Sequence, residues 1–386
     1  MTPFPPAGVK TLAEEEIFTS PIMKSFFIHL RRLDWLIITS VFLLVGVGLC
    51  SIYSSSLGRG GDLNFRKQLV FLGVGFFLML IISFFDWRNW QENPYLILIL
   101  YFLSLISLAG LFFFAPEIRG VKSWYRFNGF SLDPVEFAKI ILVVLLAKYF
   151  SMRHIEMYRI HHLFLSGFYV FLPAVLIFLQ PNMGSVLVLL SLWLGILFVS
   201  GIKIKHFLIL CLIGAAVFAW GWHSFLKDYQ KSRVINFIFP QQEPLGAGWS
   251  QMQAKIAIGA GGLFGQGLGR GSQTQLRFLP EPHTDFIFAA IAEEMGLIGV
   301  VGLFTLFAML FWRIVKISLK AQTNFPRLLA LGFGLHLAIE LFINLGMNLG
   351  ILPIIGLPLP FVSYGGSSLI TGFISLGILQ SIKANP

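Results

Sequence analysis

The stretch FLPEPHTDFIFAAIAEE, residues 278–294, places Asp285 at the start of an apolar segment and then carries Glu293 and Glu294 into its interior. The chain around it has little charge, with 12% charged and 56% hydrophobic residues among 386 positions. A soluble globular protein has about twice that charged fraction. The composition therefore predicts an integral membrane protein, in which three carboxylates so close together need a physical reason.

Apolar runs long enough to cross a bilayer recur along the whole chain. A spanning helix needs about 20 mostly apolar residues, because the hydrocarbon core is about 30 Å thick. The sequence predicts an all-α, polytopic membrane protein with about ten transmembrane helices. The predicted spans are residues 34–54, 67–85, 95–114, 135–150, 162–179, 183–201, 206–223, 284–313, 327–351 and 358–382. An even number of spans puts both termini on the same side.

The lysines and arginines of the short loops indicate which side that is, because cytoplasmic loops are enriched in them. With the termini inside, fifteen of these residues lie on the inner side and six lie in the short outer loops. We therefore predict that both termini are cytoplasmic. The net charge of +10 then belongs to loops that orient the helices and does not indicate nucleic-acid binding.

This orientation leaves two sizeable segments outside, residues 115–134 and the large extracellular loop 224–283 between helices 7 and 8. Residues 1–33 form a cytoplasmic N-terminal segment that lacks the pattern of a cleaved signal peptide. Residues 34–386 form a single transmembrane domain. Prolines and paired glycines in 352–368 predict that the last span is broken at its outer end, because lipid does not tolerate exposed irregular backbone.

Asp285 lies at the predicted outer mouth of the eighth span, and two interpretations stay open. It can be an acid at a helix N-terminus that favours the macrodipole, with Thr284 as the cap. It can also be a carboxylate that faces a water-filled cavity and acts as a general base. Glu281 and His283 lie in the loop directly before it.

Glu293 and Glu294 would lie about 12–14 Å deeper along the same helix, at about 1.5 Å per residue. Charge at that depth is costly unless it is paired. Glu136 and Lys139, in the fourth span, share one helix face. We therefore predict a buried polar cluster that joins the fourth and eighth spans, either as architecture or as the floor of a cavity.

The outer segment 115–134 interleaves basic and aromatic residues, with Arg119 and Lys122 close to Trp124 and Tyr125. One interpretation is an interfacial aromatic belt with cations that reach toward the headgroups. The other is a cationic and aromatic site for a phosphorylated, lipid-linked substrate. Spacing alone leaves both open.

Other clusters give weaker signals. The glycines of 259–271 form neither a dinucleotide fingerprint nor a phosphate-binding loop, which argues against a nucleotide site and favours a flexible or re-entrant outer loop. Cys50 and Cys211 give no zinc or disulfide spacing, so we expect them to pack in the interior. The histidines are too scattered to predict a metal site.

Several long motifs follow one another in this chain in an order that resembles the SEDS family, which contains RodA and FtsW. They are RGVKSWYRFNGFSLDPVEFAK (119–139), DYQKSRV (228–234), PLGAGW (244–249), KIAIGAGG (255–262), GSQTQLRFLPEPHTDFIFAAIAEEMG (271–296) and GILPIIGLPLPFVSYGGSS (350–368). The resemblance covers nearly all of the chain after the first thirty residues. DYQKSRV and KIAIGAGG are more similar to the RodA branch, which serves cell elongation, than to the division branch.

The resemblance implies a peptidoglycan glycosyltransferase that polymerises lipid II on the outer face of the bacterial cytoplasmic membrane. It implies that Asp285 is the essential aspartate and that Trp124, Glu136 and Lys139 lie near the cavity. The chain departs from the family pattern at two places. Asn182 stands where the family usually has an aspartate, and Ser123 stands where an arginine commonly precedes the tryptophan.

On this basis we expect Asp285 to accept the proton of the acceptor's hydroxyl in an inverting transfer that releases undecaprenyl diphosphate. The candidate groups around the substrate are Arg119, Lys122, Trp124, Glu136, Lys139, Lys255, Arg270, Glu281 and His283, with the cations facing the diphosphate. A divalent cation, Mg²⁺ or Mn²⁺, is a candidate cofactor that could share this task.

Two other functions stay open. Ionisable residues inside spans also suit a flippase that carries lipid II across the membrane unchanged. The third hypothesis is a scaffold that binds another cell-wall synthase through its outer loops. The resemblance implies a class B penicillin-binding protein and the membrane proteins of the elongation complex as partners.

Overall fold

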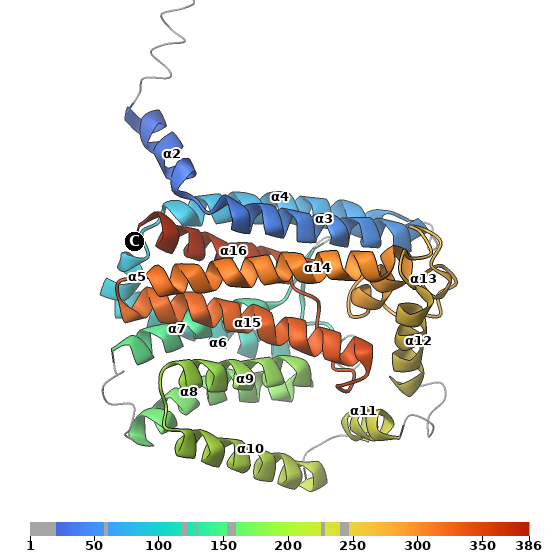
Figure 1. Cartoon of the computed structure of the whole chain (residues 1–386). Helices are drawn as coiled ribbons and strands as arrows, with labels where there is room; N and C mark the ends of the chain where they lie inside the picture. Colours follow the sequence, from blue (N-terminus) through green and yellow to red (C-terminus); the bar gives the residue numbers. More distant parts are fainter. Residues whose placement is uncertain are drawn as a thin grey trace, which may run out of the picture.

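The apolar runs fold as long helices that lie side by side in the computed structural model (Figure 1). The structure describes residues 21–57, 61–117, 122–127, 130–152, 160–224, 228–239 and 247–385. The helices are α2 (Pro21–Arg32), α3 (Trp35–Leu57), α4 (Leu63–Phe84), α5 (Arg88–Glu92), α6 (Pro94–Phe114), α7 (Pro134–Ser151), α8 (Ile160–Leu179), α9 (Met183–Val199), α10 (Ile204–Ser224), α11 (Asp228–Ile238), α12 (Ala247–Ala260), α13 (Ser272–Gln275), α14 (Ile287–Lys320), α15 (Asn324–Leu349) and α16 (Gly366–Ala384). A hairpin of β1 (Tyr125–Phe127) and β2 (Phe130–Leu132) precedes α7.

Each predicted span corresponds to a helix, namely α3, α4, α6, α7, α8, α9, α10, α14, α15 and α16. Within the described ranges, eight helices are long and apolar enough to cross a membrane, and α9 is a shorter apolar helix. The protein is thus an all-α membrane protein of several spans. The number of crossings and the sidedness stay predictions.

Small residues let the central helices approach closely. α16 packs against α4 and α14 packs against both α3 and α15. A Cβ at Gly377 would stand 2.8 Å from the carbonyl oxygen of Met79, and one at Gly75 would stand 2.6 Å from the ring of Phe373. Such contacts are typical of helix interfaces in lipid, where tight packing replaces the hydrophobic driving force.

α10 presents apolar side chains outward, with Leu212 71% and Trp220 63% exposed. Exposure of this kind is expected of a helix that faces lipid. Cys50 and Cys211 are also exposed, so the expectation that they pack in the interior was wrong. A helix face in lipid needs no polar residues, and an apolar run therefore does not reveal which of its side chains are inside.

The two ends of the bundle differ. α2 and the C-terminal end of α16 lie at one end, whereas α12 and α13 lie at the other (Figure 1). The predicted break in the last span is confirmed, because residues 353–359 are not helical and α16 begins only at Gly366. The predicted outer loop 224–283 contains α11, α12 and α13.

Candidate active site

Asp285 lies just before α14 and not within it. The predicted span began at residue 284, but the helix begins at Ile287, with Phe286 at the N-cap and no side-chain cap. The Thr284 hydroxyl donates to the Glu281 carbonyl, at 3.4 Å, so the first of the two interpretations, with Thr284 as a possible cap, does not hold for this residue. Asp285 is half-buried in a turn between the outer loop and the helix.

The turn that carries Asp285 is fixed by the segment between α15 and α16. The backbone N–H of Tyr364 donates to the His283 carbonyl at 2.8 Å. The Ser363 hydroxyl donates to the Thr284 carbonyl at 2.6 Å. Two successive carbonyls are therefore held by residues about 80 positions away in the chain.

The third carbonyl, that of Asp285 itself, is held by α15. The side-chain amides of Asn344 and Asn348 both donate to it, at 3.1 and 3.0 Å. Asn344 also donates to the carbonyl of Leu357, at 2.8 Å, and so ties the same asparagine to the loop opposite. Because the backbone of Asp285 is fixed in this way, the position of its carboxylate is restricted as well.

The Asp285 carboxylate faces the backbone of the loop before α16. Its Oδ2 lies 3.2 Å from the point where a Cβ at Gly356 would stand, and Gly356 has a φ of +78°. A larger residue there would be strained and would crowd the carboxylate. The loop thus brings its backbone close to the candidate base.

α15 carries a polar line on one face. His336, Glu340, Asn344 and Asn348 follow at intervals of four residues, which places them above one another on a helix. Their exposed fractions are 5% or less. His336 Nε2 lies 3.1 Å from Glu340 Oε1. Our sequence interpretation missed both asparagines, although their spacing in an apolar helix is a signal that could have revealed them.

The predicted buried polar cluster exists with a different partner. Lys139 is fully buried and forms ion pairs with Glu136, at 2.8 Å, and with Glu340. The cluster therefore joins α7 to α15, and the predicted link between the fourth and eighth spans was wrong. Since two carboxylates compensate Lys139 inside the bundle, direct contact of this lysine with a diphosphate is not supported by the geometry.

Glu293 binds the short helix α13 instead. Its carboxylate accepts hydrogen bonds from the backbone N–H groups of Gln273 and Thr274, at 2.7 and 3.1 Å, and from the Thr274 hydroxyl at 2.7 Å. The Ser272 hydroxyl donates as well, at 3.3 Å. The carboxylate thus satisfies N–H groups that a helix N-terminus leaves without partners.

Glu294 extends the same contact to α3. It accepts hydrogen bonds from the Ser54 hydroxyl and, at 3.3 Å, from the Gln275 side chain. The Gly269 N–H donates to the same Ser54 hydroxyl, at 2.8 Å. Both glutamates therefore hold the predicted outer loop against α14 and α3, and they bind this loop instead of the predicted partners on the fourth span.

α14 is broken just after these two glutamates. Gly296 has a φ of 65° and a ψ of −163°, so the helix is interrupted there and resumes as a second segment. Four backbone hydrogen bonds of 2.9–3.2 Å join residues 262–267 to residues 293–298 across the break. A Cβ at Gly265 would stand 2.2 Å from the carbonyl oxygen of Glu294. The glycine-rich loop therefore packs against the break.

The other candidate residues lie in several places. Lys255, on α12, packs against Gly350, where a Cβ would stand 2.0 Å from its Cε. His283 Nε2 lies 3.7 Å from Glu281 Oε2, and both residues directly precede the Thr284–Asp285 turn. Arg270 is exposed, and Lys122 and Trp124 are half-buried before β1. Arg119 lies outside the described residues.

Asp133 joins the hairpin to this end of the bundle. Its backbone N–H donates to the Ser367 hydroxyl at 2.8 Å, and its carboxylate caps α7 by accepting from the Val135 N–H at 2.9 Å. Burial, followed by the nearby Glu136 carboxylate, raises the pKa of Asp133 to about 7, against smaller lowering effects of the cap and of Lys139. The sequence interpretation did not single out this residue.

The two departures from the family pattern have defined environments. Asn182 caps α9 and accepts from the Ser185 N–H at 3.3 Å, a role that an aspartate could also fill. Ser123 is fully buried, and its hydroxyl has no hydrogen-bond partner in the part of the chain that is described. Within the same ranges, no group of three or more His, Cys, Asp or Glu side chains could hold a metal ion.

The chain is similar to known proteins along almost its whole length. Residues 34–386 match the FtsW/RodA/SpoVE family, described as cell cycle proteins. Peptidoglycan glycosyltransferase MrdB of Escherichia coli K12 is 35% identical over 370 residues, which cover 95% of this chain and 97% of that relative.

Two solved structures share the fold. The rod shape determining protein RodA of Thermus thermophilus superimposes with a TM-score of 0.68 at 29% identity, over 91% of this chain and 96% of that one. A chain from a peptidoglycan synthase complex, studied for its coordination of polymerization and crosslinking, has a TM-score of 0.79 at 31% identity. That match covers 91% of this chain and 97% of the other.

Proposed function

The chain belongs to the FtsW/RodA/SpoVE family, and on that premise we propose that it is a peptidoglycan glycosyltransferase that polymerises lipid II. It is a multi-pass membrane protein, and a relative that it matches over 97% of its length is named peptidoglycan glycosyltransferase. In this proposal it acts at the outer face of the bacterial cytoplasmic membrane during cell elongation.

The observation that carries the proposal is the fixed position of Asp285. Three successive carbonyls, from His283 to Asp285, accept hydrogen bonds from α15 and from the loop before α16. A carboxylate on a rigid turn, half-exposed where helices end, is suited to act as a positioned base. Such proton transfer typically contributes about 10²–10⁴-fold to a rate.

The transfer itself needs one base and one leaving group. Asp285 accepts the proton of the GlcNAc 4-hydroxyl of the acceptor while that oxygen bonds to the anomeric carbon of the donor. The bond from that carbon to the diphosphate breaks, and undecaprenyl diphosphate leaves with the electron pair. A double displacement would require a second carboxylate as nucleophile. We therefore propose a single inverting displacement, from an α-linked donor to a β-linked strand.

The leaving diphosphate calls for positive charge. Lys122, Lys255 and Arg270 lie on the outer segments, and we propose them, with Arg119, as the groups that meet it. Trp124 would pack against a sugar or lipid. Lys139 and Glu136 instead support the site from within the bundle, through Glu340 and the line of polar residues on α15.

A divalent cation stays a proposal as a cofactor. The described residues do not provide a set of protein ligands for Mg²⁺ or Mn²⁺, and the transfer written above uses only groups of the chain and its substrates. Polymerisation measured with each cation and with a chelator decides whether one is required.

The partner proposed for this chain is a class B penicillin-binding protein, which would crosslink the strands as they form. The support is the likeness to a chain from a complex that coordinates polymerization and crosslinking. Other membrane proteins of an elongation complex would bind the same assembly. The structure describes this chain alone.

The test is glycan polymerisation from purified lipid II, with the partner transpeptidase present, by the wild type and by Asp285→Asn. We expect polymer from the wild type and at least about 10²-fold less from the variant, because the amide cannot accept the proton. Asp62→Asn is the matched control, since Asp62 is an exposed carboxylate paired with Arg66 before α4.

Other outcomes identify the competing functions. Equal polymer from the wild type and Asp285→Asn would remove Asp285 from the mechanism. A folded wild type that moves lipid II between leaflets and makes no polymer would be a flippase. Full synthesis by the complex with Asp285→Asn, lost only after changes in the outer loops, would indicate a scaffold.

A further inference from the structure

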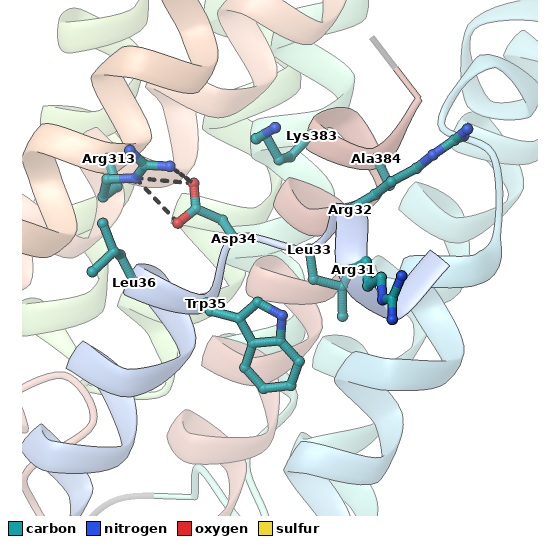
Figure 2. A pocket seen from close by; sticks show the side chains of 9 residues that line it. All are labelled: Arg31, Arg32, Leu33, Asp34, Trp35, Leu36, Arg313, Lys383 and Ala384. Carbon is teal, nitrogen blue, oxygen red and sulfur yellow. Dashed lines mark hydrogen bonds and ion pairs between the residues drawn. The ribbon is translucent and has the colours of Figure 1, made fainter. Parts of the chain in front are cut away.

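A basic pocket lies at the end of the bundle away from Asp285. It has a volume of about 680 Å³ and is formed where α2 meets α3, with Arg313 of α14 and the end of α16. Figure 2 shows its side chains, among them the four cations Arg31, Arg32, Arg313 and Lys383. The continuous part of α14 from Leu297 to Arg313 alone rises about 24 Å at 1.5 Å per residue, and so this pocket is remote from the candidate active site.

One of the four cations is neutralised and fixed in place. Arg313 Nε donates to both carboxylate oxygens of Asp34, at 2.9 and 3.1 Å. Asp34 is itself buried, and Gln380 on α16 accepts from its N–H at 2.7 Å. This buried pair therefore forms a rigid wall that joins the start of α3 to α14 and α16.

The other three cations have no carboxylate partner among the described residues. In the described part of the chain, Arg31, Arg32 and Lys383 form no ion pair, and dashed lines in Figure 2 join only Arg313 to Asp34. Four basic side chains and one carboxylate line the pocket, which leaves an excess of positive charge. Such a pocket attracts an anion, and a phosphate offers the oxygen acceptors that guanidinium groups bind best.

The surroundings indicate that the anion belongs to a lipid. Trp35 and Leu36 both line the pocket, and they are 51% and 44% exposed. Exposed aromatic side chains next to arginines are typical of the boundary between lipid tails and headgroups. A site for a soluble anion, a nucleic acid or a soluble protein does not need exposed apolar side chains at its edge.

We propose that this pocket binds the phosphate headgroup of an anionic phospholipid from the leaflet on the side of the termini. Arg31, Arg32 and Lys383 point in different directions in Figure 2 and would turn toward the phosphate when it binds. The Asp34–Arg313 pair holds the pocket open, and Trp35 packs against the glycerol and the upper acyl chain. Basic pockets between transmembrane helices bind lipid headgroups in this way. In the predicted orientation this is the cytoplasmic leaflet.

The experiment is lipid retention on the full-length, detergent-purified protein, measured by native mass spectrometry with phosphatidylglycerol or phosphatidylcholine as the probe. We expect the wild type to retain phosphatidylglycerol at least about fivefold better than phosphatidylcholine. The triple variant Arg31→Gln, Arg32→Gln, Lys383→Gln should lose this preference.

The matched control removes the same charge elsewhere. Lys205→Gln, Lys316→Gln, Lys320→Gln changes three lysines outside the pocket and predicted to lie on the same side, and it should keep the preference. Melting curves without added lipid should show both variants folded. Should the triple variant not fold, Arg32→Gln alone replaces it, since Arg32 is exposed.

Three outcomes would overturn the proposal. The triple variant could keep the wild-type preference, or the control variant could lose it equally, which would indicate net charge alone. In the third outcome, inorganic phosphate displaces bound phosphatidylglycerol as effectively as added phosphatidylglycerol does. This result would assign the pocket to free phosphate.

Discussion

At the scale of the residue, Asp285 depends on groups that no local pattern reveals. Its motif made it the candidate base, yet its position is set by residues such as Asn344 and Ser363, which follow it by 59 and 78 positions. A sequence shows which residue types are present and not which distant donors meet a given carbonyl. Asn344 and Asn348 could have been found from their four-residue spacing, but the carbonyl to which they donate could not.

Asn344→Ala tests this support. The change removes one of the two side-chain donors to the Asp285 carbonyl and the Asn344 donor to the Leu357 carbonyl, and an unsatisfied buried polar group costs about 1–3 kcal/mol. We expect the turn to shift and kcat for polymerisation to fall by about 10²-fold, as misplacement of a catalytic group by about 1 Å can do. KM for lipid II should change little.

Ser375→Ala is the control, because its buried hydroxyl bonds only within α16, to the Thr371 carbonyl, among the contacts seen. It should leave kcat unchanged. An Asn344→Ala variant with a lower melting temperature and an unchanged kcat would show that the asparagine is purely structural.

Asp133 predicts a pH dependence of stability. Its pKa is raised from the ordinary value of 3.8 to about 7, first by burial and then by Glu136. The folded state therefore binds more protons than the unfolded state between these values, so its stability falls as the pH rises through that window. Asp133→Asn keeps an acceptor for the Val135 N–H and cannot titrate.

Thermal unfolding at pH 5 and pH 8 measures this effect. From pH 5 to pH 8, the melting temperature of the wild type should fall by more than that of Asp133→Asn. Asp62→Asn should behave like the wild type because Asp62 is exposed. Parallel pH profiles for the wild type and Asp133→Asn would contradict the raised pKa.

At the scale of the element, the sequence predicted the helices and missed the break in one of them. Apolar length and composition are local, and every predicted span has its helix. The interruption of α14 at Gly296 requires the glycine loop of residues 262–267 to supply hydrogen bonds across it. Because that partner lies about 30 residues upstream, the pattern within α14 alone could not reveal the break.

Gly265→Ala tests the packing of this loop. A Cβ would stand 2.2 Å from the Glu294 carbonyl oxygen, and the φ of +79° alone costs a non-glycine residue about 1–2 kcal/mol. We expect the loop to separate from α14, which faster amide hydrogen exchange in residues 261–275 would reveal. Gly259→Ala is the control, since nothing lies within 4 Å of its Cβ. Equal exchange in both variants would argue against the contact.

At the scale of the whole molecule, two polar systems in the apolar bundle, besides the one around Glu293 and Glu294, bear on the proposals. One runs from Lys139 through Glu340 along α15 to Asp285, and the other surrounds the Asp34–Arg313 pair. A chain so poor in charge places its buried ionisable groups where helices must be tied together. The active-site proposal uses the first system, and the lipid proposal uses the second.

These two ends must face opposite sides of the membrane if the proposals hold together, and sidedness can be measured directly. The chain should be freed of its own thiols by Cys50→Ser and Cys211→Ser, both of which are exposed. Single cysteines at Lys122, before β1, and at Lys320, where α14 ends, then report the two ends. A membrane-impermeant maleimide should label Lys122→Cys in intact cells and Lys320→Cys only after permeabilisation, because the basic loops stay inside. The reverse pattern would place Asp285 on the cytoplasmic side, where a polymerase of external glycan could not work.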